Sequence, residues 1–164
     1  MIKPITRSDF ESFWPSFSRV IQARETYAFE PDMTLEQAYR LWCEQPLKTF
    51  VYMENGEVLG SYYIKPNAAG PGSHVCNCGY MVSEPARGKG AARALCEHSQ
   101  QQAVALGFKA MQFNSVVSAN EVAVRLWQKL GFEIVGRVPG AYRHARLGYV
   151  DTFVMYKWLD ADGG

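Results

Sequence analysis

The sequence predicts a mixed α/β fold, with one central β-sheet covered by helices on both of its faces. Apolar residues recur at a helical period in some segments and form short strand-like runs in others. An Asn-Gly pair joins two such runs in the first half, as in an antiparallel hairpin. Later, a strand, a glycine-rich turn, a helix and another strand follow in order, which is how parallel strands are connected. With 164 residues, we expect one domain over residues 1–164.

Two helices are expected near the N-terminus. The first begins at Ser8, where Glu11 completes a capping box, and Pro15 indicates either a kink or a later start. The second begins at Thr34, again with a capping box. Between them lies a polar and aromatic connection, residues 24–33.

The other expected elements follow the same patterns. Besides a short strand ahead of the first helix, the expected strands are residues 49–53, 58–65, 74–82, 109–116, 132–138 and 149–158. Further helices start near Gly90 and at Ser118 or Asn120, and residues 139–147 are expected to form a loop. The order gives a sheet of about six to seven strands.

Composition excludes several classes of partner. The formal net charge is +1, which provides no broad basic field for nucleic acid or an anionic membrane. No apolar run approaches the ~20 residues of a membrane span, and the N-terminus has no signal-peptide pattern. We therefore expect a cytoplasmic protein that binds neither nucleic acid nor membrane.

The four cysteines do not suggest a metal site. Cys76 and Cys78 share one face of a strand, no Cys-x-x-Cys occurs, and only three histidines are present. Adjacent positions on one strand are also poorly placed for a disulfide. Buried free thiols and no bound metal are expected.

A glycine-rich turn provides the strongest chemical signal. It lies between an expected strand and the start of an expected helix, where backbone N–H groups and the helix dipole favour an anion such as a phosphate. The Gly-Lys-Ser/Thr ending of a P-loop and the dinucleotide-binding glycine spacing are both absent. The turn consists of Arg87, Gly88, Lys89, Gly90, Ala91 and Ala92.

This turn resembles motif A of the GNAT acetyltransferases, which reads Arg/Gln-x-x-Gly-x-Gly/Ala. A second block, in the same order and at similar spacing as in that family, resembles motif B. It contains Asn120, Ala123, Leu126, Trp127, Lys129, Leu130, Gly131 and Phe132. The resemblance covers nearly the whole chain. It implies the GNAT fold, with two central strands that splay apart and admit acetyl-CoA between them.

The resemblance also implies roles for single residues. The amides of residues 87–92 would hold the pyrophosphate of acetyl-CoA, with charge added by Arg87 and Lys89. The backbone of Met81 and Val82 would pair with pantetheine, and Asn120 would hydrogen-bond to the pantetheine arm.

One position departs from the family pattern. Trp127 stands where many members carry the tyrosine that protonates the leaving thiolate, and an indole cannot serve as that acid. We expect Trp127 to form a wall near the thioester. The thiolate would then leave unaided or be protonated by another group.

A narrower resemblance concerns the acceptor. Segments around residues 74–80, 113–117 and 147–151 resemble fungal enzymes that N-acetylate azetidine-2-carboxylate and proline-like amines. That likeness implies that Asn77 and Asn114 line the acceptor pocket from the two splayed strands, as catalytic and substrate-binding residues. The alternative is that each only satisfies local backbone groups. Apart from this likeness, the bulky Tyr27, Phe29 and Tyr142 can cover the opening between the splayed strands, which favours a closed pocket for a small molecule.

The expected reaction is direct attack of a neutral amine on the thioester. Glu25, Glu30, His74, Tyr142 or a water held by the two asparagines could act as the base. The acceptor would be a small molecule, for example an amino acid or proline analogue. A cysteine nucleophile, a protein or peptide acceptor, and a catalytically weak CoA-binding module are the alternatives.

The last expected strand also bears on assembly. Residues 149–158 are long, aromatic and apolar, so an exposed strand of this kind requires cover. The family tends to pair through its C-terminal strands. We therefore expect a homodimer.

Overall fold

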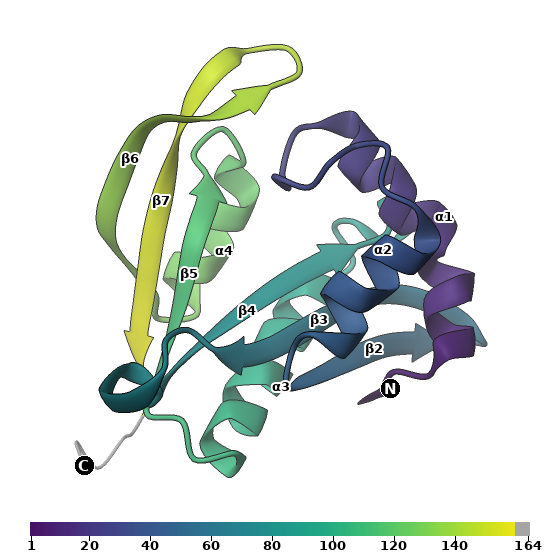
Figure 1. Cartoon of the computed structure of the whole chain (residues 1–164), viewed down its shortest axis with the longest axis horizontal. Helices are drawn as coiled ribbons and strands as arrows, with labels where there is room; N and C mark the ends of the chain where they lie inside the picture. The colour runs from purple at the N-terminus through teal and green to yellow at the C-terminus, as the bar shows by residue number, and fades with distance from the viewer. Residues whose placement is uncertain (160–164) are drawn as a thin grey trace.

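The computed structural model of the chain describes residues 1–159, and the seven strands in this part form one sheet (Figure 1). The strands are β1 (Ile2–Pro4), β2 (Lys48–Glu54), β3 (Glu57–Pro66), β4 (Val75–Val82), β5 (Ala110–Val117), β6 (Glu133–His144) and β7 (Gly148–Trp158). The helices are α1 (Arg7–Ala23), α2 (Leu35–Tyr39) with its π-helical continuation η1 (Arg40–Glu44), α3 (Ala91–Ala105) and α4 (Glu121–Lys129). Short 3₁₀ turns are η2 (Gly70–Gly72) and η3 (Glu84–Ala86).

The sheet is mixed, in the order β1-β2-β3-β4-β5-β7-β6. All neighbouring strands are antiparallel except β4 and β5, which are parallel and are connected through α3. The predicted α/β class, the parallel crossover and the helices on both faces are confirmed.

The two parallel strands separate soon after they meet. They pair only from Val75 with Ala110 to Asn77 with Gln112, although both strands continue for several residues. Beyond these pairs they diverge (Figure 1), and β5 has an irregularity between Phe113 and Val116. The diverging parts, residues 78–82 of β4 and 113–117 of β5, are called the wedge below.

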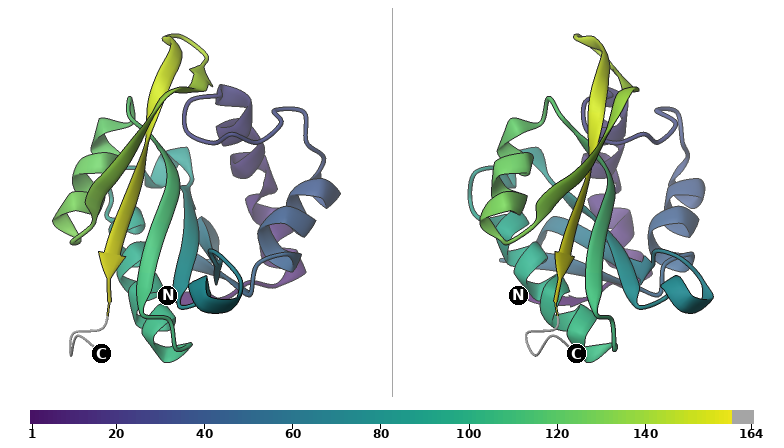
Figure 2. Two further views of the ribbon diagram at one scale, coloured as in Figure 1. Left: turned by 60° about the vertical axis from the view of Figure 1, so that its left-hand side comes forward. Right: turned by 90° about the vertical axis from the view of Figure 1, so that its left-hand side faces the viewer.

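Helices cover both faces, as the two views in Figure 2 show. The α1/α2 face is filled by a buried cluster of Phe10, Phe13, Phe17, Val20, Ile21, Ala38, Trp42 and Met81. On the α3/α4 face the buried cluster includes Tyr62, Cys76, Cys78, Leu95, Cys96, Met111, Phe113, Trp127 and Phe132. Because side chains alternate along a strand, neighbouring residues of β4 and β5 enter different cores.

The helix starts follow local capping chemistry. α2 begins after Thr34, whose side chain accepts from the Gln37 amide, as predicted. α1 instead begins at Arg7, after a capping box of Thr6 and Asp9, so the predicted capping box of Ser8 and Glu11 lies two residues too far along the chain. A later start is also wrong, because Pro15 lies inside the helix. No helix of residues 1–159 is long and apolar enough to cross a membrane.

The expected loop at residues 139–147 is wrong. β6 continues to His144, and only a short turn separates it from β7. The proline and glycine that suggest a loop lie in an irregularity between the pairs Val138–Thr152 and Tyr142–Val150, where Gly140 has a φ of 58°. The two strands therefore form a long arm beyond the sheet (Figure 1).

Candidate active site

The turn before α3 leaves the backbone N–H groups of Gly88, Gly90 and the first residues of α3 without an acceptor within residues 1–159. Gly88 and Gly90 have φ values of 77° and 82°, which side chains rarely adopt. A Cβ at either position would meet no atom of the chain within 4 Å, so the space in front of the turn is open. α3 has no side-chain cap and no acidic residue in its first turn. Its first amides therefore keep their capacity to bind an anion.

Not every amide of this turn is available. The N–H of Arg87 donates to Glu84 O at 3.1 Å, and that of Lys89 to Ala86 O at 3.3 Å. Gly88, Gly90 and the first residues of α3 supply the outward amides. Arg87 and Lys89 are exposed and would act through their side-chain charges.

One edge of β4 faces the wedge. Ser83 N donates to Leu59 O at 2.9 Å and Asn67 N to Val75 O at 2.8 Å, so odd-numbered residues of β4 point their backbone groups toward β3. Even-numbered residues, among them Tyr80 and Val82, point theirs toward the wedge. Of the two residues expected to pair with pantetheine, Val82 fits, whereas the backbone of Met81 faces β3.

Tyr27 closes part of this edge. Its hydroxyl donates to the carbonyl oxygen of Tyr80, and its ring lies 5.8 Å from the ring of Trp42. The Tyr27 side chain is partly exposed, but its hydroxyl end is buried, and this burial raises its pKa well above the ordinary value. Tyr27 is therefore a neutral donor at neutral pH and cannot serve as a base.

The arm of β6 and β7 contacts residues 24–27 through hydrogen bonds and an ion pair. Tyr142 Oη donates to Tyr27 O at 3.0 Å, Ala145 N donates to Arg24 O at 3.0 Å, and Arg146 Nη2 lies 3.1 Å from Glu25 Oε2. Figure 2 (left view) shows the arm tip beside the end of α1. We call this set of contacts the clasp.

His144 stabilises the turn of the clasp. Its Nδ1 accepts from the amides of Arg146 at 3.1 Å and Leu147 at 3.3 Å, and its side chain is buried. No sequence pattern singles out His144, because its partners lie in a segment whose proline and glycine are typical of a loop.

An amide network lies where β4 and β5 separate, on the α1/α2 face. Tyr63 Oη donates to Asn77 Oδ1 at 3.2 Å, and Asn77 Nδ2 donates to Gln112 O at 3.0 Å. Gln112 Nε2 donates to Asn114 Oδ1 at 3.0 Å, and Asn114 Nδ2 to Asn67 Oδ1 at 2.8 Å. Asn77 and Asn114 thus share one network, joined through Gln112 rather than by direct contact.

The two asparagines of the network differ in their exposure to solvent. Asn77 is buried and Asn114 is exposed. Burial, with a smaller effect of Cys78, raises the pKa of Tyr63 to about 12, so its phenol remains a donor to Asn77. Tyr63, Gln112 and Asn67 are members of the network that no sequence motif marks. The alternation of side chains along each strand predicts which residues share a face with Tyr63 or with Gln112. Their hydrogen-bond partners lie on neighbouring strands, however, and depend on the register between the strands.

On the opposite face, Trp127 forms a wall. It is 7% exposed, and its ring centroid lies 5.0 Å from that of Tyr80 and 5.3 Å from that of Phe113. Asn120 caps α4, with Oδ1 accepting from Ala123 N at 3.4 Å. The oxygen of this amide is thereby occupied, and its NH₂ group is the part that could reach a ligand.

The expected bases are not gathered at the wedge. Glu25 lies in the clasp, and Tyr142 already donates to Tyr27 O. His74 precedes β4, before the strands separate, and its Nδ1 lies 3.1 Å from Pro71 O. Glu30 lines a separate surface hollow.

The thiols are poorly suited to nucleophilic attack. All four cysteines are free, and Cys76, Cys78 and Cys96 are buried. Burial raises the pKa of Cys78 well above its ordinary value, which suppresses the reactive thiolate. Among residues 1–159, no three His, Cys, Asp or Glu side chains are grouped as a metal site would need.

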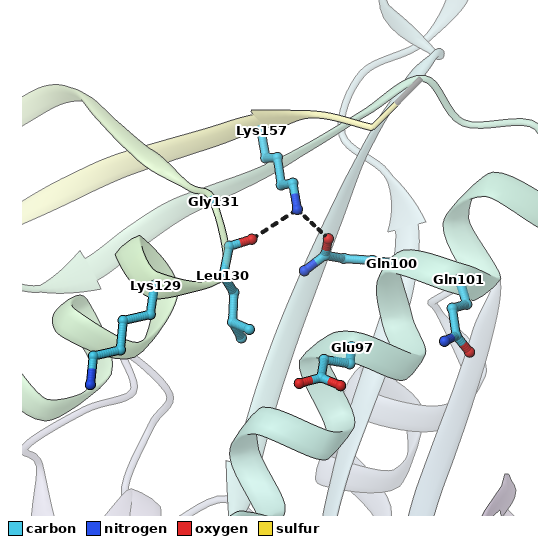
Figure 3. A pocket seen from close by; sticks show the side chains of 7 residues that line it. All are labelled: Glu97, Gln100, Gln101, Lys129, Leu130, Gly131 and Lys157. Atoms are coloured by element: carbon cyan, nitrogen blue, oxygen red, sulfur yellow. Dashed lines mark hydrogen bonds between the residues drawn. The ribbon is translucent and has the colours of Figure 1, made fainter. Parts of the chain in front are cut away.

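Two surface hollows lie away from the wedge. One of about 540 Å³ lies between α3, the end of α4 and β7 (Figure 3), where the Lys157 ammonium already donates to Leu130 O and Gln100 Oε1. The other, of about 550 Å³, lies beside α2 and η1. We place the ligand site at the wedge because the outward amides before α3 and the unpaired edge of β4 adjoin there.

Comparisons with known proteins agree with this geometry. Residues 10–132 match the model of the Acetyltransferase (GNAT) family. N-acetyltransferase aca1 of Schizosaccharomyces pombe is 35% identical over 151 residues, which are 92% of this chain and 66% of that protein. This chain therefore spans just under two thirds of the length of that relative.

Solved structures show the same fold. A GCN5-related N-acetyltransferase from Kribbella flavida is 42% identical, with a TM-score of 0.91 over 96% of both chains. The structure of yncA from Salmonella typhimurium with its cofactor acetyl-CoA is 20% identical, with a TM-score of 0.77 over 98% of this chain and 94% of that one. Because the family model matches more than half of the sequence, the chain belongs to the Acetyltransferase (GNAT) family.

Proposed function

We propose that the protein transfers an acetyl group from acetyl-CoA to the amine of a small molecule by direct attack. The observation that carries the proposal is the set of backbone N–H groups at Gly88 and Gly90 that are free within residues 1–159, next to the part of β4 that pairs with no strand of this region on its β5 side beyond Asn77. A pyrophosphate at the turn and an extended pantetheine along β4 would use both features together. Membership of the GNAT family and the relative named N-acetyltransferase support it.

Bound acetyl-CoA would supply an acetyl group activated as a thioester. Gly88, Gly90 and the first amides of α3 would hold the pyrophosphate, and Val82 would pair with pantetheine. The N–H groups of even-numbered residues in β4 would face the carbonyl oxygen and stabilise the charge that develops there. Trp127 would exclude water from the other side.

The chemical balance is simple. The amine lone pair forms the new C–N bond, the C–S bond breaks, and CoA leaves as the thiolate. The proton lost by the amine reaches the thiolate or water, with Asn77 and Asn114 orienting the amine without titrating. A neutral amine is required, because an ammonium has no lone pair to attack with.

The clasp supports a small acceptor. Tyr27 and Tyr142 join two segments across one side of the wedge, and a peptide would have to open these contacts to lie in a groove there. An amino acid or proline analogue fits the amide network better than an extended chain. We also propose that acetyl-CoA is the acyl donor and that no metal takes part.

The experiment is an acetylation screen of amino acids, proline analogues, polyamines and peptides, read as release of free thiol. Turnover of a small amine is expected. Acetylation of peptides alone would contradict the small-molecule acceptor. Binding of acetyl-CoA without turnover of any acceptor would favour the second candidate function, a CoA-binding module. Trp127 is the observation behind this candidate, because an indole cannot protonate the leaving thiolate.

We further propose a cytoplasmic homodimer. The free thiols suit a reducing compartment. The expectation that residues 149–158 form the exposed strand is wrong, because β7 is paired on both sides, with β5 and β6. β6 is instead an edge strand, and it exposes Ile134, Val135 and Val138, which a second copy would cover. Sedimentation at micromolar concentration should give twice the 18.5 kDa mass of one chain, and a single-chain mass would contradict pairing.

A further inference from the structure

Lys65 stands beside the amide network on the same face of the sheet. β3 pairs Lys65 with Asn77, and Tyr63 lies two residues before it, so the three side chains share the α1/α2 face. The Lys65 Nζ lies 5.4 Å from the centroid of the Tyr63 ring. Lys65 is exposed, and within residues 1–159 this ring is its partner, with no carboxylate at ion-pair distance.

The charges around this ammonium are unbalanced. The network next to it consists of neutral side chains, a phenol and four amides, and contains no carboxylate. Amides can orient a ligand through hydrogen bonds but cannot offset a positive charge. The local potential therefore attracts a carboxylate, and it disfavours the ammonium form of an amine, which could not attack the thioester in any case.

We propose that Lys65 binds the carboxylate of the acceptor and so selects amino-acid-like amines over amines without an acidic group. The weak contact with the Tyr63 ring holds the ammonium beside the network until an anion replaces it. With its carboxylate on Lys65, the acceptor can turn its amine toward Asn77 and the wedge. This inference rests on the proposed acetyl transfer to a small amine.

The test compares azetidine-2-carboxylate with azetidine-2-carboxamide, which has nearly the same shape but no charge. For each variant the ratio of the two kcat/KM values is measured by thiol release, so differences between the two amines cancel when variants are compared. Lys65→Met keeps the aliphatic stem and removes the charge, and Lys65→Arg keeps the charge. Lys129→Met, at the exposed end of α4, controls for loss of a surface charge elsewhere.

We expect Lys65→Met to lower kcat/KM for the carboxylate about tenfold, as expected for loss of one charge-assisted hydrogen bond, and to leave the carboxamide nearly unchanged. Lys65→Arg should retain most of the preference, and Lys129→Met should equal wild type. Calorimetric titration of the CoA-saturated protein with azetidine-2-carboxylate should show the same order of affinities.

Each outcome separates the two claims. If wild type acetylates both amines with no preference, or if Lys65→Met weakens both equally, Lys65 does not read the carboxylate and the inference is wrong, although acetyl transfer stands. If neither these amines nor any other in the screen is acetylated, the proposed function itself fails. Affinity for acetyl-CoA should be the same in all four proteins, and a loss in Lys65→Met would contradict the assignment to the acceptor.

Discussion

A methyl group at Gly79 tests whether the Tyr63 ring is fixed where the amide network needs it. Gly79 is buried in β4, and the Tyr63 ring lies across it. An ideal Cβ at Gly79 would be 2.4 Å from Tyr63 Cε2 and 2.8 Å from Cζ, far inside van der Waals contact. The ring is also held by the edge-on Trp42 at 4.9 Å and by the hydrogen bond to Asn77. Gly79→Ala must therefore displace the ring.

The expected cost follows from overpacking. Forcing extra volume into a packed site costs about 1–3 kcal/mol. For a chain of this size that lowers Tm by roughly 2–12 °C, at about 2–4 °C per kcal/mol. Asn77 loses its phenol donor at the same time, so kcat/KM for the best acceptor should fall while affinity for acetyl-CoA stays near wild type.

Thermal denaturation and thiol release provide the assay, with two controls. Gly136→Ala adds the same methyl group to a strand where the nearest atom is Val154 Cβ at 3.9 Å, and it should be neutral or stabilising by about 0.5 kcal/mol. In a Tyr63→Val background the clashing ring atoms are gone, so Gly79→Ala should cost almost nothing. A Gly79→Ala protein as stable and active as Gly136→Ala would refute the fixed ring, as would an equal cost in both backgrounds.

Three further outcomes are expected. Trp127→Phe should keep most of the activity because the ring acts as a wall, whereas a loss of about a hundredfold would reveal an essential N–H donor. Asn114→Ala should raise KM, lower kcat or both with unchanged acetyl-CoA affinity by calorimetry; unchanged kinetics would remove Asn114 from the acceptor site. Lys3 and the Thr6 cap lower the pKa of Asp9 against the opposing effect of burial. The difference in unfolding free energy between wild type and Asp9→Asn should therefore be largest above the unfolded carboxyl pKa of about 3.9. It should disappear as the pH falls through the lower pKa that Asp9 has in the folded protein. A difference that chemical denaturation shows to be independent of pH would contradict this.

The glycine turn could be predicted because its signal is local. Gly88 and Gly90 are close in sequence, and their positive φ values and their place before a helix are properties of a few consecutive residues. The Asn55–Gly56 hairpin is a similar case, with φ values of 51° and 79°. The family resemblance added the splayed strands, which no local pattern encodes.

The acceptor side could be predicted only in part. Asn77 and Asn114 stand out as asparagines in strands, but their partners come from β3 and the segment after it. Those contacts depend on the register that pairs Lys65 with Asn77, and the register between two strands cannot be deduced from a short segment of sequence.

The contacts of the clasp could not be predicted from the sequence for a different reason. A proline and Gly140 interrupt the pattern of β6 and look like a loop, although the irregular pairing there accommodates them within the arm. Tyr142 was expected to cover the acceptor, but its hydrogen bond to Tyr27 O fixes a contact that depends on the arm being a strand.

Calorimetric titration with acetyl-CoA tests the central claim most directly. Gly90→Asp and Gly56→Asp are a matched pair, because the φ values are 82° and 79° and a Cβ at either glycine meets nothing within 4 Å. Both variants bear the same backbone strain, but only the first places a carboxylate at the N-terminus of α3. We expect Gly90→Asp to weaken binding at least tenfold, about 1.4 kcal/mol or more, through repulsion of the pyrophosphate, and Gly56→Asp to bind like wild type. Equal affinities of Gly90→Asp and wild type would contradict acetyl-CoA binding at this turn.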